Sequence, residues 1–230
     1  MKYEYLIFNI IVLSGPLFFG SLKKFYFLNY WKQALLTISI SAIPFLIWDA
    51  AVTNRHWFFA EEYTLGIRFF QIPIEEIMFF FTVPYACLFT WQMVKKFSQR
   101  NTRHKKQNNR FVVFITAIVF ILIGIFTALN GKEYTAIASI FFAISVLFDT
   151  IWGAKIFTTK TFLIYYLFVS FFTLIFNGYL TWRPIVTYDE IYQLGFRIFT
   201  IPIEDFFFGY ALLIISTSLF EKMITNKRSI

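Results

Sequence analysis

Cysteine and histidine are scarce in this sequence, which limits the chemistry it can carry. Cys87 is the only cysteine and lies within an apolar run, so the sequence predicts neither an intrachain disulfide nor a cysteine metal cluster. The two histidines, His56 and His104, fall in different polar segments, so a histidine metal site is not expected. Glycine-rich phosphate-binding motifs, H-E-x-x-H and G-x-S-x-G are also missing, and we therefore expect no nucleotide cofactor.

Charged residues are scarce as well. They make up 15% of the chain, whereas 58% is hydrophobic and 23% aromatic, and the mean hydropathy is +0.63. This composition excludes the soluble class and predicts an integral membrane protein. The net charge of +8 raises the possibility of nucleic acid as a partner, but the basic residues lie almost wholly in short segments between apolar runs. We therefore expect these basic residues to contact the lipid bilayer, and we expect no nucleic acid as a partner.

Seven apolar runs are long enough to cross a bilayer as helices, which takes roughly 17 to 25 residues each. They lie near Tyr3–Ser21, Ala34–Val52, Ile74–Val94, Phe111–Leu129, Tyr134–Gly153, Phe162–Leu180 and Ile203–Phe220. The first run lacks a cleavage site and is interpreted as a retained span. Because these runs are too long and too evenly apolar for barrel strands, we predict an all-α polytopic membrane protein with seven transmembrane helices.

One segment of twenty residues occurs twice. Aligning Glu61–Phe80 with Glu190–Gly209 without a gap gives eleven identities in twenty positions, which indicates an internal duplication. The same offset of 129 residues carries spans one to three onto spans five to seven and leaves the fourth as a connector. Three spans reverse the chain's side of the membrane and the fourth restores it, so both repeats have the same orientation about a pseudo-twofold axis. We predict a first three-helix repeat over residues 1–100, a basic loop and connecting helix over 101–132, and a second repeat over 133–230.

Lysine and arginine are unevenly distributed between the two sides. Fifteen of the 21 fall in segments on the side opposite the N-terminus. Among them is the basic segment Lys95–Arg110, which contains His104 and is interpreted as a solvated anchor at anionic headgroups. By the positive-inside rule that side is cytoplasmic. We therefore predict a prokaryotic plasma membrane protein with its N-terminus outside, its C-terminus inside, and both repeated motifs entering from the extracytoplasmic half.

Each copy of the repeated segment places a proline and two adjacent acids at the start of an apolar run. The residues are Pro73 with Glu75 and Glu76, and Pro202 with Glu204 and Asp205. Proline suits the first helical position and an early acid favours the helix dipole, so helix capping is the ordinary explanation. Placing two adjacent acids in one span near hydrocarbon has a high free-energy cost, however, and such residues normally face a bundle interior. Since the arrangement is also duplicated, we favour a functional role.

Adjacent helical positions project about 100° apart, so one acid of each pair can face the pseudo-axis while the other turns toward a loop or a neighbouring helix. Glu75 and Glu204 are identical in the two copies, and each has an aromatic ring one turn deeper, Phe79 and Phe208. Several carboxyl groups in an apolar site cannot all be ionised, so we expect a proton donor beside a base. The four acids could instead hold a cation such as Mg²⁺, but no aspartate-rich signature supports a metal.

Other polar residues near the motifs have open alternatives. Arg68 and Arg197 are either counter-ions of the acids or interfacial side chains that reach the headgroups. Asp49, at the outer end of the second span, either joins the acidic cluster or lies apart from it. Asp149, toward the other side of the membrane, is interpreted as structural.

The two long connections, Thr53–Ile72 and Thr181–Ile201, are rich in aromatic residues. Aromatic side chains of this kind prefer the membrane interface. The connections therefore either pack over the outer ends of the helices and close the bundle, or form an ordinary aromatic belt.

Together these residues resemble the integral-membrane lycopene cyclase family of carotenoid biosynthesis, whose members occur as two three-span subunits or as one fused chain. In the first half the resemblance rests on Pro73-Ile74-Glu75-Glu76. In the second half it rests on Asn177-Gly178-Tyr179-Leu180-Thr181, Pro184, Val186, Tyr188, Gly195, Arg197 and Pro202-Ile203-Glu204-Asp205. The match covers nearly the whole chain, and the duplication of the acidic motif makes it specific.

The resemblance implies an isomerase that works without cofactor or metal on lycopene or a related linear carotenoid, with other enzymes of the pathway as candidate partners. An acid protonates the terminal double bond, the neighbouring alkene attacks the carbocation, and a base removes a proton to leave a ring of the β-ionone type. Glu75 and Glu204 are the candidate acid and base in either order, and Glu76 and Asp205 tune or replace them. Candidate cation-stabilising or substrate-binding residues are Phe79, Phe208, Asp49, Asn177, Arg68 and Arg197.

Two other functions fit some of the same features. A small proton-coupled transporter would also carry repeats and intramembrane acids, but these acids stand at helix starts, and no pair of Gly- or Pro-broken helices marks a central site. A non-catalytic membrane partner of a carotenoid enzyme would need only one intact acidic motif, or none.

Overall fold

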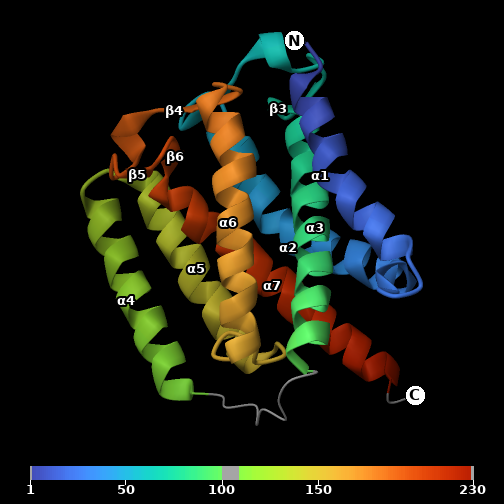
Figure 1. Ribbon diagram of the computed structural model, residues 1–230. Coiled ribbons are helices and arrows are strands. Elements are labelled where there is room, and N and C mark those ends of the chain that lie inside the picture. Colours follow the sequence, from blue (N-terminus) through green and yellow to red (C-terminus); the bar gives the residue numbers. More distant parts are fainter. Residues whose placement is uncertain (1, 100–108, 229–230) are drawn as a thin grey trace.

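The computed structural model describes residues 2–99 and 109–228 and shows a bundle of long helices covered at one end by short strands (Figure 1). The helices are α1 (Glu4–Ser21), α2 (Trp31–Val52), α3 (Ile74–Gln99), α4 (Arg110–Leu129), α5 (Glu133–Ile151), α6 (Lys160–Trp182) and α7 (Ile203–Arg228). Within the described residues, seven helical segments are long and apolar enough to cross a membrane. The predicted fold of seven transmembrane helices is confirmed.

The helix boundaries differ from the prediction mainly at the basic end of the bundle. The third and seventh helices continue past Val94 and Phe220, where their apolar runs end, to Gln99 and Arg228. Lys, Gln and Arg are good helix formers, so the helices extend beyond the apolar run. The predicted basic segment Lys95–Arg110 lies largely outside the described residues, as does His104.

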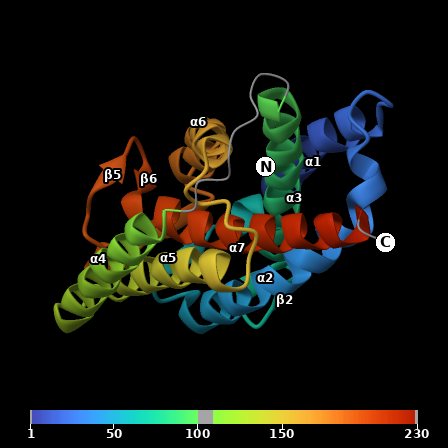
Figure 2. The same cartoon turned by 90° about the horizontal axis from the view of Figure 1, so that it is seen from below.

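The repeats are interlocked. Within each repeat the first helix packs on the third, α1 on α3 and α5 on α7, whereas the second helices reach across the pseudo-axis, with α6 packed on α3 and α2 packed on α7 as well as on α3 of its own repeat. Figure 2 shows α7 crossing the view between α3 and α6 on one side and α2 and α5 on the other. The connector α4 lies against α5, and Gly124 permits their close approach, because a Cβ there would come within 2.8 Å of Ile140 Cγ1.

The two prolines do not occupy the first helical position. Pro73 and Pro202 each stand one residue before their helix, at the end of a short antiparallel hairpin. The hairpin pairs are β2 (Arg68–Phe69) with β3 (Ile72–Pro73), and β5 (Arg197–Ile198) with β6 (Ile201–Pro202). Proline has no N–H to donate to a strand partner, and it is accepted at the end of so short a strand pair, where no such donor is required. Each hairpin therefore delivers the chain directly into the helix that carries the acids.

The two long connections meet across the pseudo-axis and close the bundle. Strand β1 (Trp57–Phe59) pairs antiparallel with β4 (Val186–Tyr188), with Trp57 opposite Tyr188. Each strand is followed by a 3₁₀ turn, η2 (Glu61–Tyr63) and η3 (Glu190–Tyr192). Trp57 and Phe59 are buried. Of the two interpretations of the aromatic connections, closure of the bundle is the one the structure supports.

Polar contacts tie the two repeats together at both ends of the bundle. At the strand-covered end, Arg183 Nε lies 2.7 Å from Glu4 Oε1, and Arg55 Nη2 lies 2.6 Å from Glu133 Oε2. Glu4 and Glu133 are related by the 129-residue offset, and each pairs with an arginine of the other repeat. At the other end, Glu221 accepts hydrogen bonds from three side chains, those of Trp91, Gln92 and Lys95.

Asp149 binds the backbone of the loop between α5 and α6, at the basic end of the bundle. Its carboxylate is buried and accepts hydrogen bonds from the backbone N–H groups of Ile156 and Phe157 and from the Ser218 hydroxyl. It has no place in the acidic cluster at the opposite end, which agrees with its interpretation as structural.

Candidate active site

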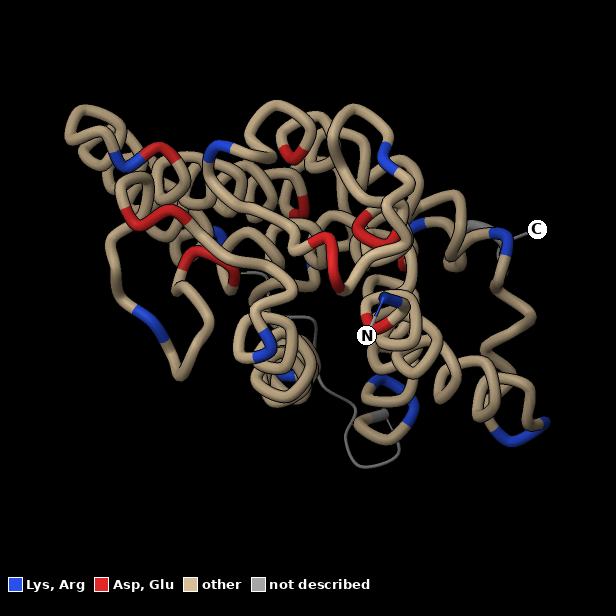
Figure 3. The backbone as a smooth tube through the Cα atoms, turned by 90° about the horizontal axis from the view of Figure 1, so that it is seen from above, with Lys and Arg blue, Asp and Glu red and all other residues tan. Residues whose placement is uncertain are grey.

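An apolar cavity of about 530 Å³ lies beside α3, with α1, α6 and α7 forming its other walls. Its lining on α3 runs from Glu76 to Thr90, a rise of about 21 Å at 1.5 Å per residue. Three carboxyl groups line it, those of Asp49, Glu76 and Asp205, and all three belong to the strand-covered end. Figure 3 views this end from above, and acidic segments gather near the centre of the view. The cavity is therefore a long apolar space with carboxyl groups at one end.

Asp205 is surrounded by hydrogen-bond donors. Its Oδ1 accepts from the Tyr134 hydroxyl at 2.5 Å, and its Oδ2 accepts from Tyr188 Oη at 2.7 Å and Asn177 Nδ2 at 2.9 Å. Burial raises the pKa of Tyr188 well above its usual value, and the neighbouring Asp205 carboxylate adds to this effect. Tyr188 therefore stays protonated and keeps donating. The three donors also fix the orientation of the Asp205 carboxyl group.

Glu76 and Asp49 have fewer donors. Within the described residues, Glu76 accepts one hydrogen bond, from the Tyr5 hydroxyl to Oε2. Asp49 Oδ1 accepts from Trp57 Nε1 at 2.7 Å and Thr53 Oγ1 at 3.1 Å, whereas Asp49 Oδ2 is buried with no hydrogen-bond partner in the described part of the chain. Asp49 thus joins the acidic cluster. Among the described side chains, no three of His, Cys, Asp or Glu are arranged to hold a metal ion.

Glu75 and Glu204 point away from the cavity and hold the loops. Glu75 Oε1 accepts from the backbone N–H of Leu65 at 2.6 Å. Glu204 Oε1 accepts from the backbone N–H of Leu194 at 2.8 Å and from Thr135 Oγ1 at 2.5 Å. Both side chains are buried and absent from the cavity lining. The predicted division of each acidic pair is present, with the second acid facing the cavity and the first turned toward a loop.

Removing these loop contacts is expected to destabilise the protein. Glu204→Ala would remove the acceptor of the buried Thr135 hydroxyl and of the part-buried Leu194 N–H, and Glu75→Ala would remove that of the part-buried Leu65 N–H, at a cost of up to about 1–3 kcal/mol per unsatisfied group. We expect a lower thermal unfolding midpoint for both variants in detergent. Gln at either position keeps a carbonyl acceptor and should unfold near the parent temperature, as should Ala at the exposed Glu62. Unchanged unfolding of Glu204→Ala would contradict this loop-holding role.

Phe79, Phe208 and Asn177, predicted for the substrate site, all line the cavity. Phe79 follows Glu76 by three residues and Phe208 follows Asp205 by three, so each cavity-facing acid has an aromatic ring one turn deeper. Phe208 also contacts Phe45, with the ring centroids 4.9 Å apart. The unit of an acid above a ring is therefore formed by Glu76 and Asp205, not by Glu75 and Glu204.

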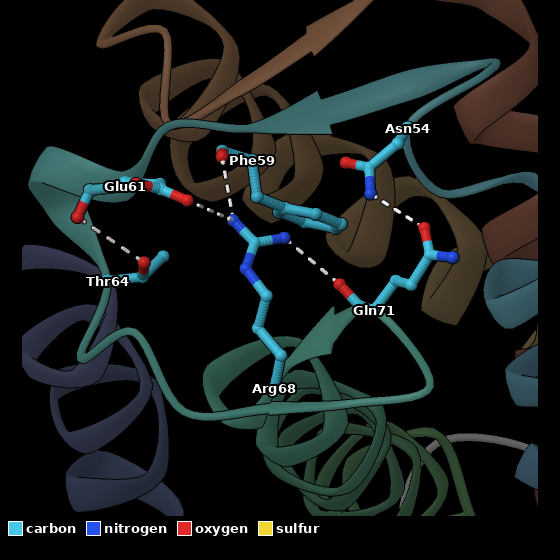
Figure 4. A network of polar contacts seen from close by, with 6 residues as sticks. All are labelled: Asn54, Phe59, Glu61, Thr64, Arg68 and Gln71. Atoms are coloured by element: carbon cyan, nitrogen blue, oxygen red, sulfur yellow. Dashed lines mark hydrogen bonds and ion pairs between the residues drawn. The ribbon is translucent and has the colours of Figure 1, made fainter.

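Arg68 and Arg197 do not line the cavity. Arg68 donates to the backbone carbonyls of Gln71 and Phe59, and its Nη2 lies 4.0 Å from Glu61 Oε1 (Figure 4). Arg197 repeats the pattern, donating to the Thr200 carbonyl at 3.0 Å. Both arginines hold their hairpins, so neither earlier interpretation, counter-ion of the motif acids or headgroup contact, describes their contacts.

Tyr5, Tyr134, Tyr188 and Trp57 are among the cavity residues that the sequence did not assign to the site, although Tyr188 is one of the residues that carry the family resemblance. Tyr5 and Tyr134 donate to the two cavity-facing acids. They are related by the 129-residue offset and each follows a glutamate, so extending the repeat alignment to the first helices would have found them. Trp57 and Tyr188 come from the paired strands, and no local sequence signal indicates that pairing.

The comparisons with known proteins agree with the duplication. A family model described as Lycopene cyclase matches two segments of the chain, residues 2–94 and 131–223. These segments contain both repeats and leave out most of the connector. No curated protein and no solved structure matches the chain.

Proposed function

The chain belongs to the lycopene cyclase family, and we propose that it closes an end of a linear carotenoid into a β-ionone ring by acid–base chemistry in the cavity beside α3. The observation that carries this proposal is the lining of that cavity, which is apolar along its length and has Asp49, Glu76 and Asp205 at one end. An apolar polyene fits such a lining, and only the chain end that reaches the carboxyl groups can exchange a proton with them.

Glu76 is assigned as the acid. Its one described donor, Tyr5, leaves the second carboxyl oxygen free to carry a proton toward the substrate. Like-charge repulsion from Asp205 and Asp49 in an apolar space also favours the neutral form of one group. In the first step the Glu76 proton adds to the terminal carbon–carbon double bond, which leaves a tertiary carbocation and the Glu76 carboxylate.

Asp205 is assigned as the base. The carbocation is attacked by the neighbouring double bond, a ring carbon–carbon bond forms, and the positive charge moves onto the ring. An adjacent C–H then gives its proton to Asp205 and its electron pair forms the ring double bond. The substrate has gained one proton and lost one, so the reaction is an isomerisation.

The three donors around Asp205 hold the carboxylate in place before this step. Return of the proton from Asp205 to Glu76 resets the site. Asp49, with its unpartnered Oδ2, is the carboxyl group through which we propose that this return occurs.

The surrounding rings support cationic chemistry. Phe79 and Phe208 stand one turn below the two acids, and an aromatic face stabilises a nearby cation by about 0.5–2 kcal/mol. Strands β1 and β4 cover the cavity at the acidic end, where Trp57 is buried. Exclusion of water matters because water would trap the carbocation as an alcohol. The Lys and Arg distribution favours an extracytoplasmic position for this end of the bundle.

Expression in lycopene-accumulating cells tests the proposed function. We expect rings of the β type in the extracted pigments, separated by chromatography and identified by their absorption spectra. The empty vector and an Asp205→Asn variant serve as controls. Unchanged lycopene in cells that contain the parent protein in their membranes would contradict cyclisation, and ε or γ rings would contradict the assigned ring type alone.

A further inference from the structure

The pseudo-twofold axis relates two grooves that differ in the side chains that occupy them in the described part of the chain. The offset of 129 residues places α1 over α5 and α2 over α6, so the groove between α1 and α6 corresponds to one between α5 and α2. The first groove holds the cavity. The second is filled by three mutually packed rings, with centroid distances of 5.0 Å for Phe45–Phe141, 4.9 Å for Phe45–Phe208 and 5.7 Å for Phe141–Phe208.

Substitutions between the repeats account for this difference. The counterpart of Phe141 on α1 is Val12, and the counterpart of Ile144 is Gly15. Val12 and Gly15 both line the cavity, and a Cβ added at Gly15 would meet no heavy atom within 4 Å. At both positions the first repeat has the smaller residue, and both smaller residues border the cavity, whereas the Phe141 ring is part of the packed group in the second groove.

The open groove has its mouth on the lipid-facing surface. Ile11, Phe19 and Phe172 line the cavity while remaining 57%, 48% and 41% exposed. Nearer the acidic end, α1 and α6 are joined by the stacked rings of Phe8 and Tyr179 and by the Glu4–Arg183 ion pair. The space between these helices is therefore closed beside the carboxyl groups and open farther along the spans, where the surface faces hydrocarbon.

We infer that the carotenoid enters from the hydrocarbon between α1 and α6 and presents one chain end at a time to the carboxyl groups, so that a second ring requires release and reversal of the chain. This inference rests on the proposed function. The carboxyl groups stand together at the closed end of a single groove, so one chain end reaches them while the remainder extends through the mouth into lipid. The related groove is filled and holds no second chain.

A matched pair of substitutions tests the entry route. Gly15→Phe places a ring in the mouth, and Ile144→Phe places the same ring at the related, exposed position on α5. We expect Gly15→Phe to slow ring formation by about tenfold or more, because the added ring occupies space through which the carotenoid would reach the cavity. Ile144→Phe should retain the parent rate. Gly15→Ile, which introduces the residue of the related position on α5, adds a smaller side chain than phenylalanine and should give an intermediate loss.

The readouts separate this inference from the proposed function. Membrane levels and unfolding temperatures of the variants are measured beside pigment formation in vesicles supplied with lycopene. In the parent, one-ring product should build up before two-ring product and exchange with labelled one-ring carotenoid added in excess. An active parent with equal rates in Gly15→Phe and Ile144→Phe overturns the entry route, and two-ring product formed without such exchange overturns the release step. An inactive parent overturns the proposed function and the inference with it.

Discussion

Replacing Glu76 with glutamine is expected to reduce ring formation by about 10²–10⁴-fold, the usual contribution of a positioned general acid. Glutamine keeps the size of the side chain and still accepts from Tyr5, but it has no acidic proton to add to the terminal double bond. Lycopene should therefore accumulate in pigment extracts of cells that express Glu76→Gln. The variant should reach the membrane in normal amounts because its contacts are retained.

The adjacent residue supplies the matched control for Glu76. Glu75→Gln makes the same chemical change one position earlier, where the side chain accepts from the Leu65 N–H and does not line the cavity. We expect Glu75→Gln to keep most of the parent activity. If the two variants lose activity equally, or if Glu75→Gln alone loses it, the assignment of Glu76 as the acid is wrong.

Replacing Asp205 with asparagine is expected to stop ring formation to a similar extent but to leave the first protonation intact. The acid can still form the carbocation, which then returns to the linear chain because no base removes the ring proton. In D₂O, linear carotenoid recovered from Asp205→Asn should therefore carry deuterium in its terminal isoprene unit, as mass spectrometry can measure. Carotenoid recovered from Glu76→Gln should carry none.

The parent protein in D₂O provides the reference, with one deuterium incorporated for each ring formed. Glu204→Gln is the neighbouring control, since its carboxylate serves Leu194 and Thr135 outside the cavity. The opposite labelling pattern, with exchange in Glu76→Gln and none in Asp205→Asn, would reverse the roles of acid and base.

Much of the architecture was predictable because a bilayer leaves few alternatives for an apolar chain. Run length and hydropathy predicted seven spans, and the odd connector predicted the parallel repeats. The choice between adjacent acids was not predictable. A rotation of 100° per residue says that Glu75 and Glu76 face different ways but not which way, and here the Leu65 N–H of the preceding loop binds Glu75 and turns Glu76 inward.

The remaining features of the site lie where the repeats differ. Tyr5 and Tyr134 occupy equivalent positions in the two repeats. The position equivalent to Asp49 is Gly178, however, and the position equivalent to Asn177 is Trp48. Repetition alone would therefore predict two equal half-sites. The unequal donor sets of Glu76 and Asp205 depend on these single departures and on the pairing of β1 with β4, which only the folded chain reveals.

The contacts of α2 with α7 and of α6 with α3 join helices that are far apart in the chain, and this affects the order in which the protein can assemble. Helices leave the ribosome in chain order, and α1, α2 and α3 enter the membrane before α6 has been synthesised. Until then α3 can pack on α1 and α2 but lacks its contacts with α6, and α2 lacks its contacts with α7. Helices first insert singly and then associate laterally. Assembly of the cavity must therefore wait for nearly the whole chain, and the last helix to emerge, α7, brings Asp205, the proposed base.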